Sequence, residues 1–273
     1  MVRGAWWPGP RGVRFEQTAR VGGMGRNSVT EAVVLRSARF AEYHKQLSLL
    51  TAAHGIIEAT AYGACKGKSK LAGATESFEL LRIYLYFEPV KKRYKLSDAE
   101  LIDDFRGIRC DVKRFYVASV ICELVRVTYA GGDEHSRVLP LLVEGFSLLS
   151  DADDERTDLL LIGMVTRFLD VIGYPIRPDE CERCGRTIAE AASRYVSPSG
   201  IFLCEACTIP EATRIPSGGR ALVGYTAGRT LTDAIRVTAD GGTRAALKRG
   251  LLSVAERVAE APLRSLRGAE GMI

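Results

Sequence analysis

Residues 77–87 read SFELLRIYLYF, a run of aliphatic and aromatic side chains that predicts a β-strand. Successive side chains of a strand point to opposite faces. Both faces of this strand are apolar, one carrying Phe78, Leu80, Tyr84 and Tyr86 and the other Leu81, Ile83, Leu85 and Phe87. Such a pattern is expected of a strand that curls inside a small closed barrel.

Four further strands are predicted around this one, because β-branched and aromatic residues alternate with turn residues. They lie at 30–37, 45–51, 55–62 and 94–96. Five short strands within the range 28–97 predict an OB-fold β-barrel. An SH3-like barrel competes with it on strand count alone.

After Ser97 the apolar period becomes helical. Helices are predicted at 111–128, 137–149, 155–172, 221–237 and 243–261. Because they flank a cysteine-rich segment at 181–209, that segment is expected to be inserted into one helical domain formed by 98–180 and 210–273. The chain of 273 residues, 47% of them hydrophobic, thus has an α+β multidomain pattern and is not disordered as a whole.

Four of the seven cysteines form two pairs, Cys181-Glu-Arg-Cys184 and Cys204-Glu-Ala-Cys207. Two CxxC turns separated by about 15–20 residues are typical of a zinc site, because each turn directs two thiolates at one cation. Four sulfurs leave no open position for water, so the expected cofactor is structural Zn²⁺. A site that has lost its metal and a redox-active CxxC pair are the alternatives.

Charge is unevenly distributed along the chain. Residues 29–96 carry a net +5 and residues 97–180 a net −8, within a total of +5. A basic barrel beside an acidic segment is typical of a polyanion-binding module, although a merely solvated surface is also compatible with it. The candidate DNA-binding cations are Arg36, Arg39, Lys45, Lys66, Lys68, Lys70, Lys91, Lys92 and Arg93. Phe40, Tyr43, Tyr84 and Tyr86 are candidates for base stacking.

The sequence argues against an enzyme. The GKS at 67–69 lacks the P-loop glycine, because Tyr62 occupies its position. The three histidines show no catalytic spacing. A zinc nuclease or an ATPase would need an open metal site or a nucleotide loop.

Residues 1–27 are predicted to be a disordered basic tail, with Met24 as an alternative start. They lack the apolar core of a secretory signal, and no apolar run in the chain reaches the length of about 18 residues that a transmembrane helix requires. A cytoplasmic protein with no membrane contact is therefore expected.

Several segments together resemble the bacterial recombination mediator family RecO. The N-terminal half of the family is matched by EAVVLR, EYHKQLSLLTAAHG, GACKGKSK and AELIDDFRG, which begin at residues 31, 42, 63 and 99. Its helical domain and zinc knuckle are matched by FLDVIGYP from Phe168 and by Cys181-x2-Cys184-Gly185, and its C-terminal segment by PLRSLR from Pro262. One departure is Ala41, which stands where the family often has glycine after an aromatic residue.

The resemblance implies an OB-fold, a helical domain with a zinc module, and a non-catalytic role in DNA repair and recombination. The implied activities are binding single- and double-stranded DNA, annealing complementary strands, and assisting RecA loading onto DNA coated with single-strand-binding protein (SSB) in the RecFOR pathway. The implied partners are RecR and the acidic SSB C-terminal tail, in the cytoplasm at the nucleoid. An RNA-binding zinc-ribbon factor of translation or transcription is the competing binding function.

Overall fold

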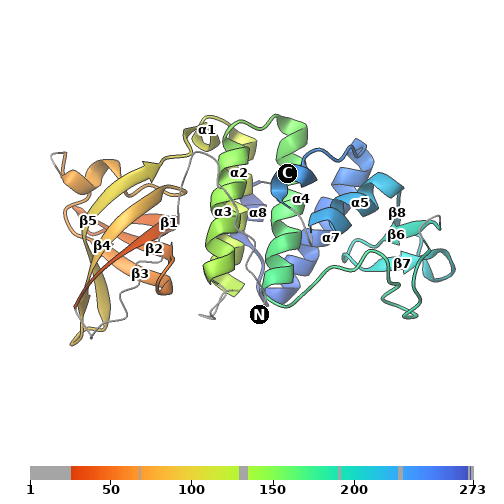
Figure 1. Ribbon diagram of the computed structural model, residues 1–273, viewed down its shortest axis with the longest axis horizontal. Helices are drawn as coiled ribbons and strands as arrows, with labels where there is room; N and C mark the ends of the chain where they lie inside the picture. Colours follow the sequence, from red (N-terminus) through yellow and green to blue (C-terminus); the bar gives the residue numbers. More distant parts are fainter. Residues whose placement is uncertain are drawn as a thin grey trace, which may run out of the picture.

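The computed structural model describes residues 26–67, 69–128, 135–189, 192–226, 230–269 and 271 (Figure 1). A β-barrel, a helical body and a small sheet follow one another along the longest axis of the molecule. Within the described residues, no helix combines the length and apolarity needed to cross a membrane. Of the predicted tail, residues 1–25 lie outside the described residues.

The N-terminal part is a closed five-stranded barrel in the order β1-β2-β3-β5-β4. Its strands are β1 (Asn27–Phe40), β2 (His44–Thr51), β3 (Gly55–Ala61), β4 (Leu80–Glu88) and β5 (Arg93–Asp103). The long β1 pairs with both β2 and β4 and has a register shift between Val34 and Arg36, which lets one strand close the barrel. The predicted OB-like barrel is confirmed.

Two strand boundaries differ from the prediction. β4 begins at Leu80 rather than at Ser77, because Phe78 adopts φ 77° and its ring leaves the barrel for the helical core. β5 continues to Asp103 rather than ending at Leu96, and only Leu96 of this strand is buried. A strand with so little buried surface has almost no apolar alternation, which is why its second half was missed. The domain division itself stays a prediction.

The helical body contains four long helices and several short ones. They are α1 (Arg106–Arg109), α2 (Val112–Thr128), α3 (His135–Ser150), α4 (Asp154–Val171), α5 (Ser217–Thr226), α6 (Leu231–Ala234), α7 (Gly241–Val258) and α8 (Arg264–Gly268). The single helix predicted at 221–237 is wrong, since α5 and α6 are separate elements. Thr230 caps α6 by accepting a hydrogen bond from the Asp233 N–H, which starts a new helix there.

The cysteine-rich segment folds as a small module between α4 and α5. Its three-stranded sheet has the order β7-β6-β8, with β6 (Arg194–Val196), β7 (Phe202–Cys204) and β8 (Thr213–Ile215). Gly200 and Gly250 bring the module against α7, because a Cβ built on Gly200 would lie 2.3 Å from the Gly250 carbonyl oxygen. α4 also packs directly on α5 and α7, so the module is an insertion in one helical body.

An aromatic cluster joins the barrel to the helices. The Phe78 ring lies between Phe115 of α2 and Phe146 of α3, with centroid distances of 5.3 and 5.9 Å. The Phe105 ring also packs against Phe146, with a centroid distance of 5.8 Å. Phe78, Phe105 and Phe146 belong to one continuous core that also includes Val33 of β1. The barrel and the helical body therefore share a core.

Ala41 in the β1–β2 turn has φ 56°, a left-handed conformation that glycine adopts without steric cost. Glycine at this position would form the same turn without that cost.

We predict that Phe78→Ala lowers the free energy of unfolding by about 3–5 kcal/mol, because it leaves a cavity where the barrel meets two helices. Urea denaturation followed by circular dichroism measures this loss. The matched control is Val90→Ala in the β4–β5 turn, where the side chain is 94% exposed and a change within about 0.5 kcal/mol is expected. Equal stabilities of the two variants would contradict a shared core.

Candidate nucleic-acid interface and metal centre

Seven of the predicted DNA-binding cations have exposed side chains in three places on the barrel. Arg36 and Arg39 lie on β1, and Lys66 and Lys70 lie in the β3–β4 connection. The third group is Lys91 and Lys92 in the β4–β5 turn, with Arg93 as the first residue of β5. Lys68 lies outside the described residues. The barrel itself thus presents these cations to solvent.

The first two groups meet at one end of the barrel. The Cys65 N–H donates a hydrogen bond of 3.1 Å to the carbonyl oxygen of Tyr43, which ties the β3–β4 connection to the β1–β2 turn. The Lys66 ammonium lies 5.4 Å from the centroid of the Tyr43 ring. Ala64 and Leu71 are buried in the barrel core, so these residues anchor the connection that carries Lys66 and Lys70.

The third group lies at the opposite end. β1 and β4 are antiparallel, with Asn27 opposite Tyr86, so the β4–β5 turn lies where β1 begins. Lys91 is partly neutralised by Glu88, at 3.8 Å. The structure therefore separates the predicted cations into two basic ends rather than one cluster.

Lys95 connects the two ends, a role that the sequence reasoning missed. Its ammonium lies 5.9 Å from the Tyr62 ring and 5.8 Å from the Tyr86 ring, and 3.0 Å from a Glu88 oxygen. The hydrogen bond with Glu88 raises the pKa of Lys95, so the ammonium stays charged. Tyr62 in turn packs edge-on against His44 at the other end, at 4.9 Å. Cations and rings thus alternate along this face, as single-strand binding surfaces require.

Lys45 does not belong to this surface. Only 9% of the residue is exposed, and its ammonium is bound to Glu76 at 2.7 Å and to the Thr75 hydroxyl at 3.1 Å. The β3–β4 connection covers it, a tertiary contact that local sequence does not reveal. Its position gives no support to the predicted DNA contact, and we assign Lys45 the structural role of anchoring that connection.

The candidate stacking residues fall into two classes. Phe40 and Tyr43 are exposed, by 47% and 43%, at the end of the barrel that carries Lys66. Tyr84 donates its hydroxyl hydrogen to Glu100 at 2.8 Å, whereas Tyr86 lies beside Lys95. The two exposed rings and Tyr86 are therefore placed for stacking next to a cation.

The four paired cysteines converge in the small module. Their sulfur atoms all lie within 4.8 Å of one another, with Cys184 and Cys204 3.9 Å apart. Four thiolates at about 2.3 Å from a tetrahedral Zn²⁺ lie about 3.8 Å apart, so the spacing fits such an ion. Gly185, at φ 70°, lets its N–H turn back to the Cys181 carbonyl oxygen at 2.7 Å and forms the first metal-binding turn.

The electrostatics of the cluster also suit a cation. Burial acts to raise the pKa of Cys181, but hydrogen bonds from the N–H groups of Cys204, Cys184 and Arg183 outweigh it and lower the pKa to about 6. Hydrogen bonds with Cys184 and Cys204, together with burial, raise the pKa of Cys207 to about 12. One thiolate is thus favoured, whereas further thiolates repel one another until a positive charge compensates them.

Comparisons with known proteins agree with this architecture. Family models described as "Recombination protein O N terminal" and "Recombination protein O C terminal" match residues 24–105 and 109–267. The chain belongs to the RecO family.

Curated relatives carry the name "DNA repair protein RecO". One from Bifidobacterium adolescentis is 34% identical over 68% of this chain and 75% of its own. Another, from Anaeromyxobacter dehalogenans, is 29% identical over 88% of this chain and 89% of its own. The similarity to the second relative extends over most of both chains, so it includes both the barrel and the helical body.

We predict that the purified chain binds one Zn²⁺ and that Cys207→Ser abolishes this binding and lowers the melting temperature. Cys110→Ser, which changes an exposed cysteine outside the cluster, is the matched control and retains the metal. Because Cys207 must lose a proton to bind the metal, affinity falls as the pH decreases. Elemental analysis and competition with a chromophoric chelator measure both effects. Full metal content in Cys207→Ser would contradict the assignment.

Proposed function

We propose that this chain is a non-enzymatic DNA repair protein that binds DNA through its barrel and anneals complementary strands. The observation that carries this proposal is the face on which Lys95 links two basic ends through tyrosine rings. Such a face holds a sugar-phosphate backbone with its cations and leaves rings for the bases. The names of the relatives, all DNA repair proteins, support the same role.

Annealing follows from neutralising two strands at once. Two polyanions repel each other, and lysines and arginines at both ends of one barrel lower that repulsion by displacing condensed counterions. The exposed side chains make contacts that do not depend on base sequence, so any complementary pair is brought together. Base pairing itself then supplies the specificity.

The proposal includes the partners that the family resemblance implied: RecR, the acidic SSB tail and, indirectly, RecA. An acidic tail with an apolar end would be recognised by a basic and apolar groove between helices. The metal centre is assigned a structural role, because its four sulfurs complete a tetrahedron and leave no place for a substrate.

We predict that Lys66→Glu/Lys70→Glu weakens binding to single-stranded DNA equally for every sequence tested. The slope of log K against log salt becomes less negative by about 0.7 for each phosphate that the variant no longer neutralises. Fluorescence anisotropy at several salt concentrations gives both quantities. Arg186→Glu/Arg214→Glu, the same charge change on exposed arginines of the metal module, is the matched control. An unchanged affinity and slope in the lysine variant would remove the β3–β4 connection from the interface.

A second prediction concerns activity. The wild-type chain should accelerate annealing of complementary strands coated with SSB, and SSB lacking its C-terminal tail should reduce the acceleration. Fluorescence quenching between labelled strands measures the rate. Equal affinity for RNA and DNA without annealing would favour an RNA-binding function, and ATP turnover by the pure protein would favour an enzyme.

A further inference from the structure

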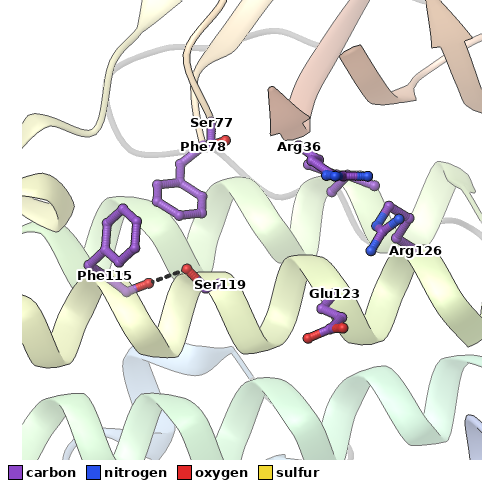
Figure 2. Close-up of a pocket in the computed structure, with 8 residues that line it drawn as sticks. Arg36, Ser77, Phe78, Phe115, Ser119, Glu123 and Arg126 are labelled. Carbon is purple, nitrogen blue, oxygen red and sulfur yellow. Dashed lines mark hydrogen bonds between the residues drawn. The ribbon is translucent and has the colours of Figure 1, made fainter. Parts of the chain in front are cut away.

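A groove of about 200 Å³ runs between β1 of the barrel and α2 of the helical body (Figure 2). Arg36 and Phe78 line it from the barrel side, and Phe115, Glu123 and Arg126 line it from α2. Pockets that enclose a drug-sized ligand are usually larger, about 300–1,000 Å³. This groove therefore suits a single ring with an attached anionic group.

One end of the groove is aromatic. Phe115 is 42% exposed, although its ring packs edge-on against Phe78, which is only 2% exposed. The Ser119 hydroxyl donates a hydrogen bond of 2.8 Å to the carbonyl oxygen of Phe115, one turn earlier in α2. The Phe115 ring is thus supported from below by the shared core and still accessible from solvent.

The other end is cationic. Figure 2 shows the guanidinium groups of Arg36 and Arg126 at the end away from the two phenylalanine rings. Within the described part of the chain, neither guanidinium has a carboxylate within the 4 Å of an ion pair, whereas nearby Arg109 is paired with Glu79. Two arginines that line one groove without a paired acid form a site for an anion.

Glu123, the acidic residue of the groove, is already bound elsewhere. Its carboxylate accepts hydrogen bonds from the Ser265 N–H at 2.7 Å, the Ser265 hydroxyl at 2.6 Å and the Arg264 N–H at 3.1 Å. Burial acts to raise the pKa of this carboxyl, but these bonds, together with the charge of Arg126, outweigh it and lower the pKa. They also hold the carboxylate toward the start of α8, so that within the described residues Glu123 forms no ion pair with either guanidinium group, although its charge still acts on Arg126 at longer range.

We propose that this groove binds one nucleotide of a DNA single strand, with its phosphate between Arg36 and Arg126 and its base stacked on Phe115. The inference rests on the proposed function. A nucleotide bound here would extend the DNA path from the barrel onto the helical body. Arg36 lies on β1 together with Arg39, and β1 ends at the basic end of the barrel that carries Lys66. An acidic peptide is less well suited, since the arginine pair and the single exposed ring of the groove match the phosphate and the base of one nucleotide.

The first test uses the full chain and single-stranded oligonucleotides that lack secondary structure. Arg126→Ala should weaken binding and make the slope of log K against log salt less negative by about 0.7. Arg214→Ala, on β8 at the other end of the molecule in Figure 1, is the matched control and should change neither quantity. A slope equal to that of the wild type in Arg126→Ala would overturn the proposal.

The second test separates stacking from charge. Phe115→Ala should weaken binding about fivefold or more without changing the salt slope, whereas Phe115→Trp should retain affinity and lose fluorescence when DNA binds. Val127→Ala, at a 41% exposed position of the same helix outside the groove, is the control. Thermal melting checks that each variant is folded. An unquenched Trp at this position with normal affinity would contradict stacking.

Three further results distinguish this inference from the proposed function. If Lys66→Glu/Lys70→Glu loses affinity while both groove variants bind like the wild type, the groove assignment is wrong and the barrel interface stands. If the wild type binds no DNA, both fail. If an acidic peptide with an apolar C-terminal residue loses binding in both groove variants while DNA binding is unchanged, the groove is a peptide site and the proposal is overturned.

Discussion

The Phe78 ring between α2 and α3 is the contact on which the rest of the molecule depends. Its residue adopts φ 77°, a conformation that costs a non-glycine residue free energy, and the packing of the ring offsets that cost. The backbone remains tied to the barrel, since the Phe78 N–H donates to the Val34 carbonyl oxygen at 2.8 Å. One residue thus couples two modules and fixes the groove between β1 and α2 at their junction.

The structure accounts for the uneven distribution of charge along the sequence. Several acidic residues of the segment at 97–180 pair with the C-terminal part of the chain: Asp158 contacts Lys248 at 2.8 Å, and Asp179 binds Arg220 at 2.5 Å. Burial acts to raise the pKa of Asp158, but hydrogen bonds with Lys248 and Lys113 outweigh it and lower the pKa. The acidic residues therefore join helices, whereas the exposed cations of the barrel have few acidic neighbours and are available to a polyanion.

Sequence patterns correctly predicted those parts of the fold that are determined by residues close together in the chain. The barrel strands followed from alternation, and the metal site followed from the spacing of Cys181, Cys184, Cys204 and Cys207. Tertiary contacts set the remainder. Burial of Lys45 depends on Thr75 and Glu76, 30 and 31 residues away, and the position of Lys95 between two tyrosines depends on strand pairing. No local pattern joins Arg36 to Arg126 either, because a register shift in β1 and a helix about 90 residues later bring them together.

Lysine footprinting tests the central claim, that DNA lies on the barrel, most directly. The chain is treated with an amine-reactive reagent with and without saturating single-stranded DNA, and mass spectrometry locates the modified residues. The account predicts that DNA protects Lys66, Lys70, Lys91 and Lys92, while Lys45 reacts poorly in both states because it is buried and paired. Unchanged reactivity of these four barrel lysines at saturating DNA would contradict it.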